Sequence, residues 1–281
     1  MGEITGSTHR LAGRVFSSFS ATTLSRSDRV LISACIVVVT ALAWGYLVHL
    51  DHEMSTDMEH DKAMAAMGMT TMQMPWTAAD VSLTFAMWTV MMAGMMVPTA
   101  APLLLLFAAA RAGGERDHVV LATLIFGLGY VTVWSGFSLC AAIAQWALHQ
   151  AAMLSISQAA SSPQFSGAIL ITAGGYQLTS WKSRCLTHCR SPLGFLMSNW
   201  RDGKLGAFQM GVRHGAYCLG CCWALMCVLF VVGVMNLMWV AALTVFVLLE
   251  KIGRQGAIFS RVAGAAMVVL GIAVMALRHG S

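Results

Sequence analysis

Thiol, thioether and imidazole side chains recur at helical spacing around residue 215. The sequence Met-Gly-Val-Arg-His-Gly-Ala-Tyr-Cys-Leu-Gly-Cys-Cys occupies residues 210–222. At about 100° per residue, roughly a third of a helix circumference carries five of these side chains: Met210, His214, Cys218, Cys221 and Cys222. Soft metals, Cu(I) above all, prefer such ligands. The face therefore predicts a metal or thiol-redox site, although free Cys is also a common small apolar residue in helices.

A second sulfur group, Cys185-Leu-Thr-His-Cys, precedes the first and adds Cys185, His188 and Cys189. Arg184 and Arg190 flank it, and nearby positive charge lowers the pKa of a thiol and favours the thiolate that binds metal. The spacing of these cysteines departs from the paired knuckles of structural zinc, which favours Cu(I) over zinc. The isolated Cys35, Cys140 and Cys227 are assigned to packing.

Methionines form a stripe on an apolar segment near residue 90. One face of a helix there would carry Asp80, Thr84, Met87, Met91, Met95, Pro98 and Pro102. Met92 and Met96 each follow a stripe residue directly and join the candidate ligands. Proline removes a backbone donor and frees a carbonyl of the preceding turn, which membranes tolerate where protein or a cavity receives it. The alternative is a kinked helix in which Met only fills space.

A third candidate group lies between the first two apolar segments and comprises His52, Met54, Met58 and His60. Further methionines follow it up to Met74. Thioethers remain competent ligands in an oxidising compartment, where free thiols would be lost, and they select Cu(I) over hard ions. The segment is therefore predicted to capture metal. The alternatives are a gap-filling role for Met or a helix lying on the membrane surface.

The composition indicates which elements must position these groups. The 281 residues are 58% hydrophobic and 10% charged, with a mean hydropathy of +0.71, whereas soluble domains carry about a quarter charged residues. We predict an all-α, polytopic transmembrane helix bundle. Residues 1–28 form a cytoplasmic N-terminal tail, 29–50 the first transmembrane helix and 51–78 a Met/His-rich extracytoplasmic loop. Residues 79–281 form the transmembrane core, with a Cys-containing cytoplasmic loop at 182–205.

About seven spans account for the apolar segments. Residues 216–249 carry no charge, and a single helix of that length would reach about 50 Å, so we predict a turn at Gly233 and Asn236. Seven spans put the basic loops on the side of the N-terminal tail, whereas the loops 51–78 and 150–164 contain one Lys and no Arg. The expected location is the cell inner membrane, multi-pass, with a cytoplasmic N-terminus.

Three further features bear on function. Glu250 and Lys251 close the sixth span, and an ion pair between them is the simplest interpretation. Glycines in the apolar segments predict close helix contacts, among them Gly129, Gly136 and Gly211. The sequence contains no P-loop, dinucleotide fingerprint, HExxH motif or convincing nucleophilic triad, which argues against an ordinary enzyme.

Several runs together carry a family resemblance. They begin at Met91 (Met-Met-Ala-Gly-Met-Met-Val-Pro), Gly175, Gly215, Gly233 and Leu249. From about residue 79 to the C-terminus the chain resembles a bacterial family catalogued as predicted metal-binding integral membrane proteins, a domain of unknown function. The resemblance names no reaction. It implies a metal site among Met91, Met92, Met95, Met96, Cys185, Cys189, Cys218, Cys221 and Cys222.

These features lead to a hypothesis of soft-metal transport or delivery, with copper as Cu(I) the favoured ion and another soft metal the alternative. The outer segment would collect the ion, the Met stripe would pass it inward, and the Cys face would receive it. Expected partners are the lipid bilayer, the metal ion and other membrane subunits or a periplasmic metal carrier, but not nucleic acid. One alternative is a metal- or thiol-dependent redox enzyme, or a subunit of a membrane oxidase or oxygenase complex. The other is a structural subunit without metal.

Overall fold

The structure, a computed structural model, describes residues 24–67, 76–113, 118–151, 153, 162–234, 236–253 and 255–276. Every regular element in these residues is a helix, which confirms the predicted all-α class. The elements are α2 (Arg26–Ala66), α3 (Ala78–Ala112), α4 (Val119–Gln150), α5 (Pro163–Gln177), α6 (Ser180–Arg190), α7 (Pro192–Asn199), α8 (Gly203–Cys227), α9 (Leu229–Val232), α10 (Leu237–Ile252) and α11 (Gly256–Ala276).

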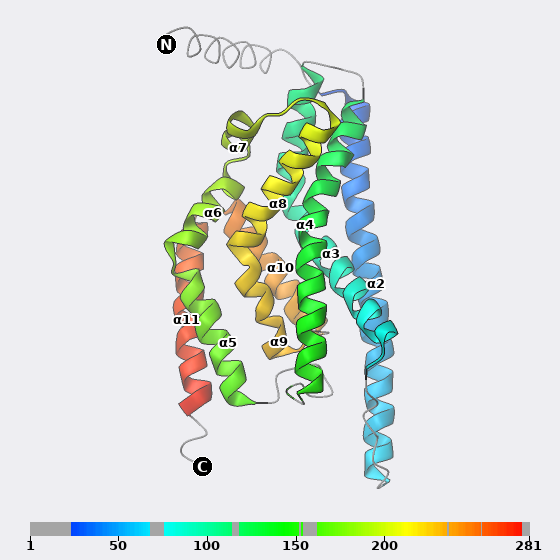
Figure 1. Cartoon of the computed structure of the whole chain (residues 1–281), viewed down its shortest axis with the longest axis vertical. Coiled ribbons are helices and arrows are strands. Elements are labelled where there is room, and N and C mark those ends of the chain that lie inside the picture. The colour runs from blue at the N-terminus through cyan, green and yellow to red at the C-terminus, as the bar shows by residue number, and fades with distance from the viewer. Residues whose placement is uncertain are drawn as a thin grey trace.

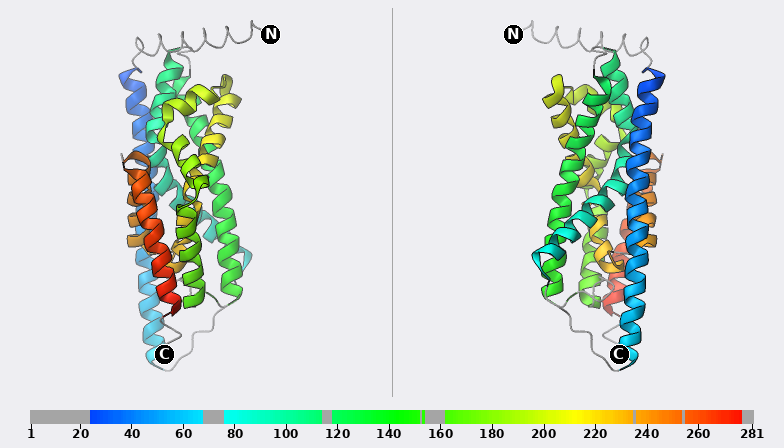
Figure 2. Two further views of the ribbon diagram at one scale, coloured as in Figure 1. Left: turned by 90° about the vertical axis from the view of Figure 1, so that its left-hand side faces the viewer. Right: turned by 90° about the vertical axis from the view of Figure 1, so that its right-hand side faces the viewer.

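The long helices lie side by side along one axis (Figure 1). α8 packs mainly on α4, α4 on α3, and α3 on α2, while α5 pairs with α11 in a second layer. Figure 2 shows the same pairing of α5 with α11 from both sides. α6 continues upward from α5 and packs on α8, and the short α10 approaches α3, α6, α8 and α11. The cysteine-bearing α6 and α8 are thus neighbours of the methionine-bearing α3.

Among the described residues, five helical segments are long and apolar enough to cross a membrane: Arg26–Thr56, Ala78–Ala112, Val119–Gln150, Gly203–Val232 and Gly256–Ala276. The helices α5 and α10 have 15 and 16 residues. At about 1.5 Å per residue they reach less than the roughly 30 Å of a hydrocarbon core. The chain nevertheless reverses direction between successive members of the series α2, α3, α4, α5, α8, α10 and α11 (Figure 1). The count of seven crossings remains a prediction.

Two segments predicted as loops contain helices. α2 continues through Ala66, so residues 51–66 extend the first helix by about four turns. This stretch is rich in good helix formers, and the hydroxyls of Ser55 and Thr56 donate to carbonyls one turn earlier. Residues 182–205 hold most of α6, all of α7 and the start of α8. Local propensity therefore continues the helices beyond the apolar stretches that the hydropathy marks.

The predicted turn between the fifth and sixth apolar segments is present. α8 ends at Cys227, the short α9 follows, and Gly233 adopts a φ of 96°, which a side chain would make unfavourable. The side chain of Asn236 then accepts from the Trp239 backbone amide at 3.4 Å and caps α10. The chain therefore returns into the bundle at the expected position.

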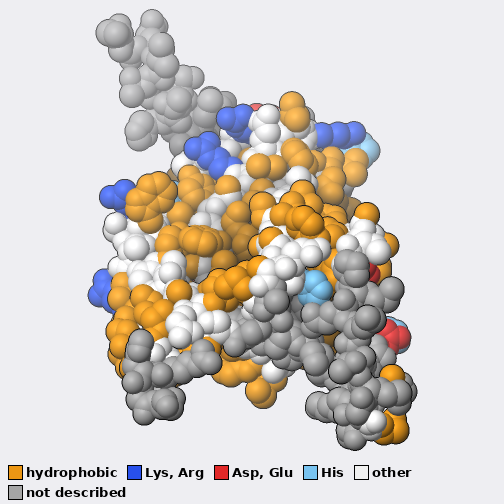
Figure 3. All heavy atoms as spheres, turned by 60° about the horizontal axis from the view of Figure 1, so that its bottom comes forward, with side chains coloured by type: hydrophobic (Ala, Val, Ile, Leu, Met, Phe, Trp, Pro, Cys, Tyr) orange, Lys and Arg blue, Asp and Glu red, His pale blue; other side chains and the backbone are white. Residues whose placement is uncertain are grey.

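Basic side chains gather at one end of the described structure. The start of α2, the end of α3 and the start of α8 lie together at that end and carry Arg26, Arg29, Arg111 and Lys204. Figure 3 looks toward the opposite end, where hydrophobic side chains dominate the described surface and Lys and Arg lie toward the rim. This asymmetry is the one expected from the positive-inside rule. The orientation itself remains a prediction.

Backbone contact between α4 and α8 depends on glycine. A Cβ built on Gly211 would lie 2.0 Å from the carbonyl oxygen of Phe126, and one on Gly129 would lie 2.3 Å from that of Phe208. The expectation of a close helix contact is thus confirmed for these two. It is wrong for Gly136, which has nothing within 4 Å. The close approach places Tyr130 of α4 against the cysteine face of α8.

Replacing Gly211 by Ala should lower the melting temperature of the purified protein, because α4 and α8 must separate to admit the methyl group. Gly136→Ala on α4 is the matched control. A helical Gly→Ala change without a clash is worth about 0.5–1 kcal/mol in favour of the folded state, so this variant should melt at or above the wild-type temperature. Equal melting temperatures for the two variants would contradict the proposed packing.

Candidate metal centre

The predicted methionine stripe lies in the core. The exposed fractions of the five α3 methionines are 6% for Met87, 1% for Met91 and 0% for Met92, Met95 and Met96. Asp80, which the sequence placed on the same face, instead accepts from the backbone amide of Thr77 at 2.7 Å and caps the exposed start of α3. The stripe thus offers a line of thioethers inside the protein. Burial of this kind suits either packing or ligation.

The inner end of this stripe meets the cysteine face of α8 at Lys251. The ammonium nitrogen of Lys251 lies 2.9 Å from Cys218 Sγ, 3.0 Å from Thr99 Oγ1 and 4.0 Å from Met96 Sδ. The hydroxyl of Tyr130 joins the same two helices, because it lies 3.0 Å from Cys218 Sγ and donates to the Met96 carbonyl at 3.1 Å. A thioether and a thiol from different helices therefore surround one positively charged group.

A pair of thiols joins α6 to α8. Cys221 Sγ lies 4.0 Å from Cys189 Sγ, about 0.6 Å less than twice a zinc–sulfur bond of about 2.3 Å. The thiols of Cys221 and Cys222 both donate to the Cys218 carbonyl at 3.0 Å. All eight cysteines are free. One ion entering between Cys189 and Cys221 could bind both sulfurs with little movement, as a two-coordinate soft metal would.

The environment of α6 does not lower the thiol pKa values. Burial raises the pKa of Cys185, and hydrogen bonds that Cys189 makes with Cys218 and Cys221 raise the pKa of Cys189 well above that of an ordinary thiol. The predicted effect of the flanking arginines is therefore wrong, since Arg184 is exposed and Arg190 donates to the Gly253 carbonyl at 2.7 Å. Both α6 thiols are protonated without metal, so metal binding there must release protons.

The two histidines of the candidate site have different environments. His214 is buried one turn before Cys218, and its Nδ1 is without a hydrogen-bond partner among the described residues. His188 is exposed, its ring stacks on Tyr217 with centroids 4.3 Å apart, and its Nδ1 lies 2.9 Å from the Arg184 carbonyl. His214 is available to the cysteine face. His188 is engaged elsewhere.

Within the part of the chain that the structure describes, no three His, Cys, Asp or Glu side chains lie close enough to hold a metal ion. A preformed tetrahedral site such as zinc requires is therefore not seen there. The arrangement consists of sulfur pairs and thioethers. Cu(I) accepts such soft, low-coordinate ligand sets.

The outer candidates are only partly described. The side chains of Met58 and His60 lie outside the described residues, and His52 is exposed on α2. Met54 instead lines a cavity of about 420 Å³ together with Met87, the first methionine of the α3 stripe. His49 and Glu53 line the same cavity, with His49 Nε2 3.3 Å from Glu53 Oε1. Two groups that the sequence analysis treated separately therefore share one vestibule.

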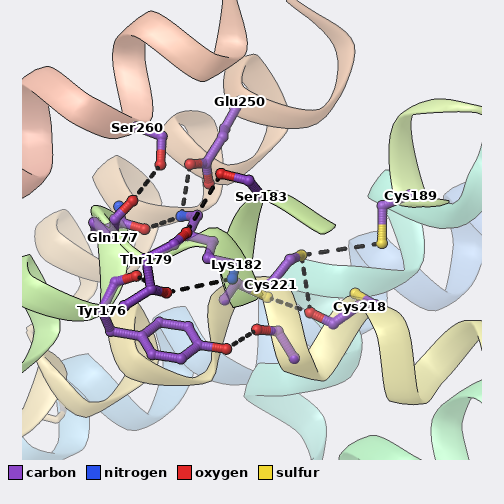
Figure 4. A network of polar contacts seen from close by, with 12 residues as sticks. Tyr176, Gln177, Thr179, Lys182, Ser183, Cys189, Cys218, Cys221, Glu250 and Ser260 are labelled. Atoms are coloured by element: carbon purple, nitrogen blue, oxygen red, sulfur yellow. Dashed lines mark hydrogen bonds and ion pairs between the residues drawn. The ribbon is translucent and has the colours of Figure 1, made fainter. Parts of the chain in front are cut away.

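The structure also separates Glu250 from its predicted partner. Glu250 pairs with Lys182 of α6, Oε1 to Nζ at 2.6 Å, and both side chains are 1% exposed. Figure 4 shows this pair beside Gln177 and Ser260, with the Cys189, Cys218 and Cys221 group on the neighbouring side. The expected Glu250–Lys251 pair is wrong because adjacent residues point to different sides of a helix. Lys251, Tyr130, Thr99 and His49 were not among the predicted site residues, and only a charge at the end of an apolar segment marked Lys251.

Lys182→Met should strongly destabilise the protein, because it leaves the Glu250 carboxylate buried without its counter-ion. Removing one partner of a buried pair typically costs about 3–5 kcal/mol, whereas replacing both by apolar residues is often neutral. The double variant Lys182→Met/Glu250→Leu should therefore recover most of the lost stability in a denaturation experiment. A double variant less stable than the single one would show that the two side chains do not form the pair.

The fold and the site together define a class of protein. It is an all-helical protein with helices long and apolar enough for a membrane, and with thioethers and thiols that converge in its core. A family model described as a copper chaperone, PpoB2, matches residues 85–274. The chain therefore belongs to this copper chaperone family. No curated protein and no solved structure matches it significantly. The matched range contains all five α3 methionines and both cysteine groups, but it begins within α3 and so leaves out α2.

Proposed function

We propose that this protein is a multi-pass membrane protein, of the cell inner membrane with a cytoplasmic N-terminus, that delivers Cu(I) through its core. The ion is the cargo. It enters the vestibule between Met54 and Met87, passes along the α3 thioethers, and is received by the thiols of α8 and α6. Family membership supports copper as the ion, and the five apolar helices support the membrane.

The contact of Lys251 with both Met96 and Cys218 carries this proposal. An ammonium group is a compact monovalent cation, and here it lies within 4.0 Å of a thioether and 2.9 Å of a thiol. The space between the two sulfurs therefore already accommodates a positive charge. Cu(I) carries the same charge and binds both kinds of sulfur, so it can occupy the space between them once the ammonium group moves aside. The Cys218 thiol releases its proton on binding, and the resulting Cu(I)–thiolate pair carries no net charge into the buried site.

Beyond Cys218 the ion has a second acceptor. Cys221 lies one turn further along α8, and its sulfur approaches Cys189 of α6. Sulfur ligands spaced in this way permit transfer by exchange, in which a new sulfur binds before the previous one leaves. Low coordination favours such exchange because an open position is available to the incoming ligand.

A direct test is Cu(I) affinity under anaerobic conditions. The double variant Cys189→Ser/Cys221→Ser should bind Cu(I) at least about tenfold more weakly than wild type in competition with a colorimetric Cu(I) chelator, a change of about 1.4 kcal/mol. Cys35→Ser/Cys140→Ser removes the same number of thiols away from the site and should bind as wild type does. If neither wild type nor variant retains Cu(I), the protein is not a copper carrier, and a thiol-redox or purely structural role becomes the better explanation.

The route through α3 has a separate test. Met91→Leu/Met95→Leu keeps volume and hydrophobicity while removing two thioethers, and such swaps usually cost less than about 1.5 kcal/mol of stability. Cu(I) transfer from the vestibule side into proteoliposomes should slow severalfold, while Cu(I) binding to the cysteines persists. Met197→Leu/Met238→Leu, at 54% and 67% exposed positions, is the control. Unchanged transfer in the α3 variant would exclude the methionines from the route.

A further inference from the structure

A second cavity, of about 370 Å³, lies on a different face of α6 from its thiols. The end of α5, the length of α6 from Ser180 to Arg190 and the first turns of α11 line it. Its volume falls in the range of small-ligand sites, roughly 300–1,000 Å³. No step of the proposed copper route uses it, and its lining contains no sulfur among the described residues.

The charged side chains in this lining are all basic: Lys182, Arg190 and Arg261. Glu250, outside the lining, pairs with Lys182 at 2.6 Å and offsets its charge. Arg261 and Arg190 are the other basic groups of the lining, and the Arg190 guanidinium also donates to the Gly253 carbonyl at 2.7 Å. Serine and threonine hydroxyls from α6 and α11 add further donors to the lining. This combination of arginines and hydroxyls is suited to an anion.

Gln177 provides the most specific indication that the cavity binds a ligand with an acceptor oxygen. The side chain lines the cavity, is 3% exposed, and its Nε2 is without a hydrogen-bond partner among the described residues. The orientation of the amide follows from chemistry, because Lys182 is a donor only and contacts Gln177 Oε1. The amide NH₂ must therefore point to the other side. A buried donor left unsatisfied costs free energy, which an acceptor oxygen in the cavity would recover.

Apolar side chains are exposed at the cavity and on the helices that line it. Leu178 lines the cavity itself and is 51% exposed. Trp181 on α6 and Phe259 and Val262 on α11 lie next to lining residues in sequence and are 71%, 46% and 63% exposed. Exposed apolar and aromatic side chains beside a basic pocket are typical of the headgroup level of a membrane, where pockets between helices hold anionic lipid headgroups.

From the basic lining, the unsatisfied Gln177 donor and the exposed apolar side chains of Leu178 and its helical neighbours, we infer that this cavity binds the phosphate group of an anionic ligand. Arg190 and Arg261 supply the charge, and Gln177 Nε2 donates to a phosphate oxygen. Leu178 in the lining and the exposed apolar side chains on α6 and α11 favour a phospholipid headgroup as the source of the phosphate over free phosphate in solution.

The test measures the melting temperature of the detergent-solubilised full chain during titration with three probes. These are a short-chain phosphatidylglycerol, a phosphatidylcholine of the same acyl length, and inorganic phosphate. A ligand that binds only the folded state raises the melting temperature saturably. Phosphatidylglycerol should do so and phosphatidylcholine should not, because its choline group meets the arginines with a positive charge.

Arg261→Gln and Gln177→Leu should each raise the half-saturating concentration about tenfold, the loss expected for one charge-assisted or buried hydrogen bond. Arg213→Gln, at an exposed position of α8 outside the lining, removes the same charge and should titrate as wild type does. Saturation by inorganic phosphate with the same variant pattern would support the site but make free phosphate its ligand. No saturable shift with either anion, or a shift that both lining variants leave unchanged, would overturn the inference.

Discussion

The end of α10 brings two buried charges into the core, and the arrangement of the neighbouring helices depends on how these charges are satisfied. Glu250 pairs with Lys182 of α6, while Lys251 reaches Cys218 of α8 and Thr99 of α3. Because a buried charge without partners is strongly unfavourable, three helices must present the right groups to one point of α10. The convergence of thioether and thiol ligands follows from that requirement. α10 has 16 residues, and its last turn carries Glu250 and Lys251 into contact with these three helices.

The ligand geometry suits a protein that passes a metal on. A resident metal is usually held by a closed set of ligands with defined angles. The described residues instead offer a thioether–thiol pair at Lys251 and a thiol–thiol pair between α6 and α8, and no three of their His, Cys, Asp or Glu side chains lie close enough to hold a metal ion together. Membership of a copper chaperone family agrees with this open arrangement.

Much of the fold could be predicted from local patterns in the sequence. Hydropathy marked the long helices, and the uncharged stretch around Gly233 was too long for one crossing, so the turn followed from geometry. The faces of α3 and α8 followed from helical periodicity, which is why the buried methionines and Cys218, Cys221 and Cys222 were among the candidates. These predictions concern residues close together in the chain, where backbone geometry determines the outcome.

Features that depend on packing between distant segments could not be predicted in the same way. The partner of Glu250 is 68 residues away in sequence at Lys182, and nothing local distinguishes it from the adjacent Lys251. His188 seemed well placed between two cysteines, yet an aromatic face on α8 engages its ring. The extension of α2 to Ala66 shows a related limit, because hydropathy reports where a helix is apolar and not where it ends.

The Tyr130 hydroxyl links the α3 backbone to Cys218, so the hydrogen bond to α3 depends on whether that sulfur carries a proton or a metal ion. A hydroxyl has a single proton, and here it is given to the Met96 carbonyl, so a protonated Cys218 keeps its contact with Tyr130 by donating to the tyrosine oxygen. A metal-bound sulfur has no proton and can only accept. Tyr130 must then either turn its proton to that sulfur and release the carbonyl, or lose the contact with Cys218. Occupation of one sulfur atom thus reverses or breaks a hydrogen bond whose other end is the α3 backbone, two residues before Pro98.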